Sequence, residues 1–164
     1  MAAQDKLSFA FEKLLAPAAG RPGFAPTEEP GHQLNVSVVF TSVPATLVAL
    51  KRAAAMAASL NACISLVVPQ IVPYPLPLTS PPVLVDFNER RFRVIASEIP
   101  IETTVRVYLC RDKWDALSAV LRPHSIVVVG ARRRWWPTAE MRLVKKLRAA
   151  GYEVIVAGTE QGNG

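Results

Sequence analysis

The stretch ARRRWWPTAE, residues 131–140, places three consecutive arginines and two tryptophans directly after an apolar run. Arginine guanidinium groups bind phosphate through paired hydrogen bonds, and tryptophan rings stack on guanidinium groups and on nucleic-acid bases. Four interpretations are open: a solvated loop in which arginine stems cover tryptophan faces, a phosphate or nucleotide site, a surface for single-stranded nucleic acid, and a protein interface. The elements that position the cluster bear on this choice.

The positive charge of the chain is concentrated around this cluster. The 164 residues include 19 Lys and Arg against 13 Asp and Glu, a formal net charge of +6. Residues 131–150 carry that whole excess, and the remaining charges cancel. The charged residues of this segment are Arg132, Arg133, Arg134, Glu140, Arg142, Lys145, Lys146 and Arg148. No nucleic-acid-binding motif accompanies them, so nucleic acid is not the expected partner.

Residues suited to catalysis or metal binding are sparse elsewhere. Cys63 and Cys110 are far apart, and with only His32 and His124 beside them the sequence predicts no metal site. The serines lack a nucleophile-elbow context, and neither histidine has a nearby carboxylate, so we expect no enzyme activity. Arg111 could lower the pKa of the adjacent Cys110 thiol, but a structural role is expected for both cysteines.

The chain shows no signal peptide and no membrane-spanning segment by composition. Asp5 and Glu12 interrupt the apolar N-terminal stretch, and the later apolar windows are broken by Lys51 and Arg52 or by proline. We therefore expect a cytoplasmic protein with reduced thiols and without a membrane partner. The length and the 51% hydrophobic content fit a single core.

The first 33 residues form an extension before the main domain. Leu7, Phe11, Leu14 and Leu15 follow helical spacing, which predicts a short amphipathic helix over residues 5–15 that docks on the body. Glycines, prolines and polar residues without periodicity follow, as is typical of a linker. We expect an N-terminal extension over residues 1–33 and an α/β domain over residues 34–164.

Strands and helices alternate through the main domain. β-branched apolar runs predict five strands, and amphipathic segments with capping residues predict four helices between them. The strands are expected at 34–40, 62–68, 103–109, 125–130 and 152–158, and the helices from Ser42 through Leu60 and at 83–97, 113–121 and 138–150. Six prolines from Pro69 to Pro82 predict an extended, stiff connection without regular structure.

This alternation predicts an α/β fold, an open five-stranded parallel sheet with helices on both faces. The strand over residues 152–158 is expected at a sheet edge, where a second copy of the chain can pair. The expected partners are therefore a second subunit and a protein that the sequence does not identify.

Four segments follow one another in a characteristic order: VSVVFTSVP at 36–44, VVPQIVPYPLPL at 67–78, VYLCRDKWDALSAV at 107–120 and HSIVVVGAR at 124–132. Together they resemble the universal stress protein family, whose domains are Rossmann-like and related to the adenine nucleotide alpha hydrolases. The resemblance implies strand order 3-2-1-4-5, in which the first and fourth strands end beside each other at a crevice where ligands bind. Candidate crevice residues are Thr41, Ser42, Gly130, Arg132, Arg133, Arg134 and Thr138.

The nucleotide-binding pattern of that family is degenerate in this chain. Thr41 stands where nucleotide-binding members have an acidic residue, and Arg133 stands where their second glycine follows Gly130. The Gly-Ser or Gly-Thr pair that should close this loop is absent because the loop is shorter and passes through Trp135, Trp136 and Pro137. The expected function is a homodimeric regulatory or interaction module without a cofactor. The alternative is an adenine-nucleotide or phosphate site, for ATP or AMP, in which Arg132–Arg134 replace the glycine-rich loop.

Overall fold

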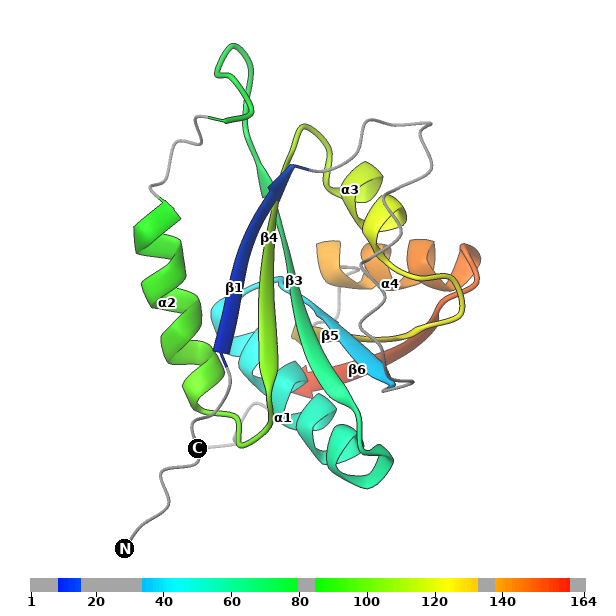
Figure 1. Ribbon diagram of the computed structural model, residues 1–164. Helices are drawn as coiled ribbons and strands as arrows, with labels where there is room; N and C mark the ends of the chain where they lie inside the picture. Colours follow the sequence, from blue (N-terminus) through cyan, green and yellow to red (C-terminus); the bar gives the residue numbers. More distant parts are fainter. Residues whose placement is uncertain (1–8, 16–33, 80–84, 133–137, 160–164) are drawn as a thin grey trace, which may run out of the picture.

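A six-stranded parallel sheet forms the centre of the computed structural model, which describes residues 9–15, 34–79, 85–132 and 138–159 (Figure 1). The strands are β1 (Phe9–Leu15), β2 (Asn35–Val39), β3 (Cys63–Ile71), β4 (Thr103–Cys110), β5 (Ile126–Arg132) and β6 (Glu153–Thr159). The helices are α1 (Val43–Leu60), α2 (Val85–Ser97), α3 (Lys113–Val120) and α4 (Ala139–Ala149). The strand order is β1-β4-β3-β2-β5-β6. Leaving β1 aside, this is the predicted parallel sheet with order 3-2-1-4-5, which is confirmed.

Two apolar layers cover the sheet, one on each face. Leu50 of α1 and Phe92 of α2 are buried on one face, while Leu117 of α3 and Leu147 of α4 are buried on the other. Figure 1 shows α2 beside β1 and α3 with α4 across the sheet from α1. Val127 and Val129 of β5 pack in one of these layers and Val128 packs in the other, so both faces of the apolar part of this strand are covered.

Helix α1 illustrates why composition alone does not define a membrane span. Its length and apolar composition satisfy the requirements for crossing a membrane, so the prediction that no segment does so by composition is wrong for this helix. However, Ala49, Leu50 and Ala53 are fully buried within the core formed with the sheet. Packing against the sheet accounts for the apolar character of this helix.

The predicted helix ends are confirmed at several capping residues. Asp112 accepts a hydrogen bond from the Asp115 backbone N–H at the start of α3, and Thr138 accepts one from Met141 at the start of α4. Asn61 ends α1 in the left-handed region with φ 52°, and Gly151 follows α4 with φ 93°. Local capping chemistry therefore sets these boundaries.

The helix predicted over residues 5–15 is wrong, because the structure has strand β1 over Phe9–Leu15. β1 pairs in parallel with β4, from Phe9 opposite Thr103 to Leu15 opposite Leu109. The edge of β4 offers a row of backbone hydrogen-bonding groups, and an isolated helix of this length is marginal in water. Pairing along the sheet therefore overrides the helical spacing of the apolar residues.

The prediction that the proline-rich segment lacks regular structure from Pro69 onward is also wrong for its first residues, since β3 runs on to Ile71. The Val67 carbonyl accepts a hydrogen bond from Phe40, so the N–H and C=O groups of every second residue here face β2. Pro69 would direct its missing N–H to the same side, but β2 ends at Val39, opposite Val67. Proline therefore removes no ladder hydrogen bond at this position.

Candidate functional site

The expected crevice lies where β2 and β5 end side by side at the centre of the sheet. Val39 of β2 is opposite Val129 of β5, and the chain leaves β2 through Thr41 and Ser42 into α1. Thr41, Ser42 and Gly130 are therefore brought together, as the strand order predicted. Ligands of open α/β sheets bind at such topological switch points.

The hydroxyl and the backbone N–H of Thr41 both form hydrogen bonds within the protein. Its hydroxyl Oγ1 donates to the Gly130 carbonyl at 3.0 Å and so joins the ends of β2 and β5. Its backbone N–H donates to Oγ1 of Thr46, a fully buried side chain, at 3.2 Å. Thr41 thus forms a structural bridge between the ends of β2 and β5.

Gly130 has a packing role. A Cβ atom at this position would collide with the backbone carbonyl of Ala45 in the first turn of α1. The backbone of Gly130 is not in the left-handed region, so its conformation does not require glycine. This residue is glycine because α1 lies directly on β5, and Ala45 occupies the space on this side of Gly130.

Ser42 differs from its neighbours because its hydroxyl is buried without a partner. It is the N-cap residue of α1, with φ −133° and ψ 161°, yet its side chain makes no capping hydrogen bond. Oγ of Ser42 is the one buried side-chain oxygen or nitrogen without a hydrogen-bond partner in the described part of the chain. A buried hydroxyl normally finds a partner, so this oxygen marks an unsatisfied polar position at the helix terminus.

The arginine cluster falls only partly within the described residues. Arg132 is the exposed last residue of β5, two positions beyond Gly130 and therefore on the α1 side of the sheet. Thr138 serves as the N-cap of α4, where its hydroxyl accepts from Met141 at 3.3 Å. Arg133 and Arg134, together with the neighbouring tryptophans, lie outside the described residues.

Cys110 is a structural thiol at the end of β4. Its Sγ donates to the Gln70 carbonyl at 3.5 Å. Burial raises the pKa of the Cys110 thiol, and the negative charge of Asp112 raises it further. Arg111 does not lower this pKa, because its guanidinium turns away to the Val72 carbonyl and the Tyr74 ring.

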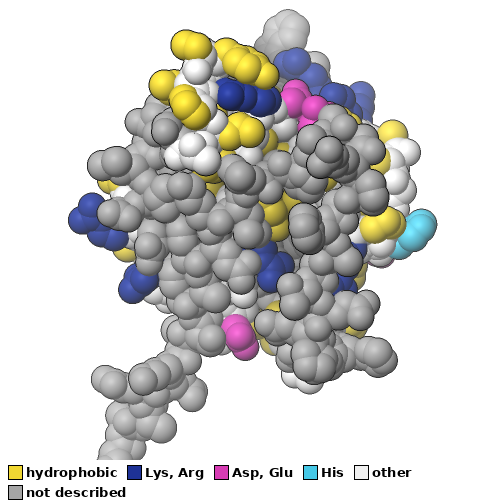
Figure 2. Space-filling view, turned by 45° about the horizontal axis from the view of Figure 1, so that its top comes forward, with side chains coloured by type: hydrophobic (Ala, Val, Ile, Leu, Met, Phe, Trp, Pro, Cys, Tyr) yellow, Lys and Arg dark blue, Asp and Glu magenta, His cyan; other side chains and the backbone are white. Residues whose placement is uncertain are grey.

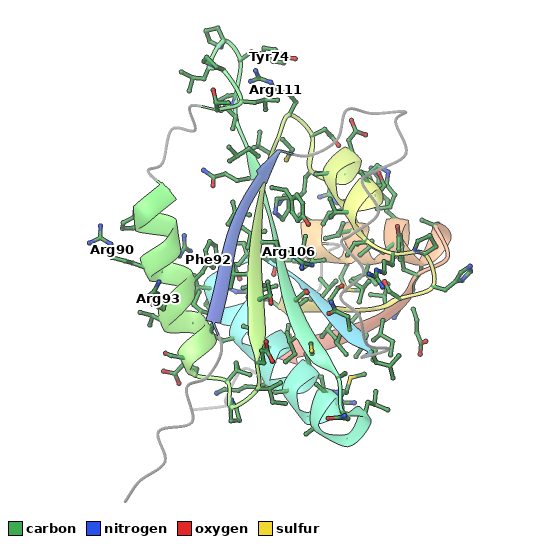
Figure 3. All side chains as sticks on the ribbon, viewed as in Figure 1. Tyr74, Arg90, Phe92, Arg93, Arg106 and Arg111 are labelled. Atoms are coloured by element: carbon green, nitrogen blue, oxygen red, sulfur yellow. The ribbon has the colours of Figure 1, made fainter. Side chains whose placement is uncertain are left out.

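The Arg111–Tyr74 pair was not among the predicted site residues. Arg111 Nη1 donates to the Val72 carbonyl at 2.7 Å, and its guanidinium carbon lies 4.0 Å from the centroid of the Tyr74 ring. Figure 3 shows Tyr74 on the segment that projects beyond the carboxyl end of the sheet and Arg111, which follows β4, beside its base. The available signal was an aromatic residue between prolines in an uncharged stretch, together with a basic residue at the end of the neighbouring strand.

The described residues contain no group of three His, Cys, Asp or Glu side chains that could hold a metal ion. No family model, curated protein or solved structure matches the chain. The resemblance to universal stress proteins therefore depends on the four motifs and their order.

Proposed function

We propose that the protein is a regulatory or interaction module of the universal-stress type, that it forms a homodimer, and that it lacks the ATP site of that family. The observation that carries the proposal is the packing of Ala45 against Gly130. A glycine-rich phosphate loop works because its backbone leaves room for phosphate close to amide N–H groups. In this protein a backbone carbonyl of α1 occupies the space beside Gly130 that a Cβ atom would take, so helix packing already uses this side of the glycine.

The electrostatic character of the closed crevice also disfavours phosphate. The oxygen next to Gly130 is the Ala45 carbonyl, and a carbonyl dipole presents its negative end to an approaching anion. The Thr41 hydroxyl is already committed as a donor to Gly130. The groups that would first meet a phosphate beside Gly130 are thus used for packing and hydrogen bonding within the protein.

Homodimer formation through β6 is the second part of the proposal. β6 is the outermost strand next to β5, whereas β1 covers the opposite edge of the sheet at β4. The sequence of β6, EVIVAGT, contains neither proline nor lysine, the residues that commonly protect an edge from pairing. A second copy can add its own β6 there and continue the sheet.

Light scattering after size-exclusion chromatography tests the dimer. We expect a dimer at tens of micromolar, and Gly158→Lys should shift it toward monomer by placing a charge on the edge. A Cβ at Gly158 meets no atom within 4 Å, so the substitution fits within one subunit. Gly158→Ala is the matched control and should remain dimeric. A monomeric wild type would contradict this part of the proposal.

An anion site is the second candidate function, and the unpartnered Ser42 hydroxyl favours it. This oxygen lies at the N-terminus of α1, where anions are stabilised by the helix dipole, and Arg132 extends from the same side of the sheet. In this alternative, Arg132, Arg133 and Arg134 bind an adenine nucleotide or phosphate in place of the glycine-rich loop. Guanidinium groups provide the hydrogen-bond donors that the closed backbone does not.

A thermal-shift titration separates the two candidates. ATP, ADP, AMP and sulfate are added to wild type and to a variant with Arg132, Arg133 and Arg134 replaced by alanine. A ligand at a hundred times its Kd adds about 2.7 kcal/mol to the unfolding free energy. The closed-site proposal predicts no stabilisation that depends on the adenine group.

Stabilisation by ATP beyond that by sulfate, lost in the triple variant, would overturn the closed-site proposal in favour of an arginine site. The matched control replaces Arg142, Lys145 and Lys146, three exposed basic residues of α4, with alanine. It removes the same charge away from the crevice. A response lost equally in both variants would indicate only a general electrostatic effect.

A further inference from the structure

A short apolar segment projects from the carboxyl end of the sheet between β3 and α2. We name residues 71–78 the spur. Its exposed large side chains include Tyr74, with 79% of its surface accessible, and Leu76, with 37%. Figure 1 shows the spur extending beyond the strands, and Figure 2 shows hydrophobic side chains gathered around a basic one over this end of the molecule. Exposed apolar groups that cluster on a projection indicate a contact with an apolar partner.

The spur carries no charge and offers few backbone hydrogen-bond donors. No charged residue occurs between Val67 and Val85. Within residues 72–77, the three prolines lack an N–H donor, and the N–H groups of Val72 and Leu76 donate to the Cys110 and Pro73 carbonyls at 2.9 and 3.0 Å. Among residues 72–77, Tyr74 is therefore the one non-proline residue whose backbone N–H donates no backbone hydrogen bond within the described part of the chain. Transfer of this segment into an apolar medium therefore leaves few donors unsatisfied.

Arg111 holds the spur and supplies a cation at its base. Its guanidinium donates to the Val72 carbonyl and stacks on the Tyr74 ring at 4.0 Å. Figure 3 shows this pair at the spur, remote from Phe92, which lies between α2 and the sheet. The remaining guanidinium donors match the geometry of a phosphate group. The spur thus combines an apolar tip with an aromatic residue and a phosphate-binding cation just behind it.

We propose that the spur is a peripheral membrane anchor. Leu76 and the neighbouring prolines enter the acyl region of one leaflet, while Tyr74 and Arg111 lie at the level of the phospholipid headgroups. Tyrosine is favoured at membrane–water interfaces, because one end of its ring is apolar and the other is polar. Arg111 binds headgroup phosphate. This contact is independent of the proposed homodimer and of any nucleotide at the crevice.

The chemistry of the spur favours a bilayer over a protein groove. Protein interfaces form about one hydrogen bond per 100–200 Å² of buried surface, and the spur has few backbone donors to contribute. The exposed Asp112, Lys113 and Asp115 follow Arg111, and the charges of residues 111–115 cancel. Insertion of the apolar tip should therefore contribute more to binding than attraction to anionic lipid.

The experiment is vesicle flotation with the full-length protein. Vesicles of phosphatidylcholine alone are compared with vesicles that also contain a minority of phosphatidylserine. Wild type should float with both and more strongly with phosphatidylserine. Tyr74→Ser/Leu76→Ser should lower the partition coefficient at least about tenfold, since loss of 1.4 kcal/mol is tenfold and each buried side chain contributes that much or more.

The matched control changes two exposed apolar residues of α2. Phe87 and Val94 are 55% and 65% accessible, so Phe87→Ser/Val94→Ser removes a comparable apolar surface away from the spur. Its partition coefficient should stay within about twofold of wild type, which is the spread expected for surface changes away from the contact. Leu76→Asp is a second spur variant that leaves Tyr74 in place and should also prevent insertion.

Three outcomes would overturn the proposal. One is a wild-type protein that does not float with either vesicle. Another is equal loss of flotation in the α2 control. The third is self-association of the wild type that the spur variants abolish without any binding to vesicles, which would assign the spur to a second copy of the chain. A rise in the surface pressure of a phosphatidylcholine monolayer, absent with Leu76→Asp, would show insertion directly.

Discussion

Two regions at the carboxyl end of the same sheet differ in whether their side chains contact the rest of the protein or face solvent. At the switch point between β2 and β5, small and polar residues are used internally: Thr41 bonds to Gly130, and Gly130 accommodates Ala45. At the spur after β3, Tyr74 and Leu76 face solvent. The glycine and threonine that suggested a ligand site have roles in packing and hydrogen bonding within the protein. The proline-rich segment after β3, in contrast, presents exposed apolar side chains.

Residue type alone does not show whether a side chain can bind a ligand. A side chain can act on a ligand only if its hydrogen-bonding or apolar groups are not already satisfied within the protein. By that criterion Ser42 is the residue of the switch point that retains an unused group. At the spur, Arg111 retains guanidinium donors after binding Val72. Substitutions at the switch point should therefore change mainly the free energy of unfolding, and substitutions at the spur should act locally.

The largest effect is expected at Gly130. Gly130→Ala would force the first turn of α1 away from β5, because the added Cβ meets the Ala45 carbonyl. Overpacking against backbone should lower the free energy of unfolding by about 3 kcal/mol. Urea denaturation measures the change. Gly158→Ala, where the added Cβ meets nothing within 4 Å, is the control and should change stability by less than about 0.5 kcal/mol. Equal effects at both glycines would contradict the packing role.

A smaller effect is expected at Arg111, and it should be local. Arg111→Ala removes the hydrogen bond to Val72 and the stacking on Tyr74, with an expected loss of about 1.5 kcal/mol. The Leu76 amide, which donates to Pro73, should exchange its hydrogen roughly tenfold faster as the spur opens. Arg111→Lys keeps the charge but lacks the planar guanidinium group. Its stability and its Leu76 exchange rate should lie between those of wild type and Arg111→Ala. Unchanged exchange would mean that the spur is held without Arg111.

Thr41→Val tests the bridge across the switch point. The substitution removes the hydroxyl that donates to Gly130 and should cost about 1 kcal/mol, because this bond is partly buried. Ser97→Ala is the comparison, since the Ser97 hydroxyl also donates to a carbonyl, at 2.7 Å, but is exposed. Its loss should be no more than about 0.3 kcal/mol. A loss at Ser97 as large as that at Thr41 would remove the distinction between the two bonds.

The sequence was sufficient to predict five of the six strands and the four helices. Apolar β-branched runs indicated the strands, and Asp112 and Gly151 lie at helix ends because capping chemistry acts within a few residues. The β1 strand was missed because its partner is the edge of β4, almost a hundred residues away. The continuation of β3 through Pro69 was missed for a similar reason, since it depends on where β2 ends.

The proximity of Thr41 and Gly130 was predicted, but the close packing of α1 against Gly130 was not. Strand order alone places Thr41 beside Gly130, so their proximity followed from the fold. Whether the space is open depends on how closely α1 approaches β5, a distance that no local pattern encodes. The spur was missed because prolines were interpreted only as breakers of regular structure. The contact of Arg111 with Tyr74 joins the segments that follow β4 and β3, which lie far apart in the sequence.

The smallest expected change, at Ser42, most sharply distinguishes the two candidate functions. If the crevice binds no anion, Ser42→Ala removes a buried hydroxyl without a partner, and stability should stay equal or rise by up to about 1 kcal/mol. If an arginine site uses this hydroxyl, the variant should instead lose stabilisation by sulfate or ATP. Thermal unfolding with and without sulfate measures both effects. A less stable variant in the absence of any anion would contradict the unsatisfied state of Ser42, because only a hydroxyl with a partner contributes stability that alanine cannot replace.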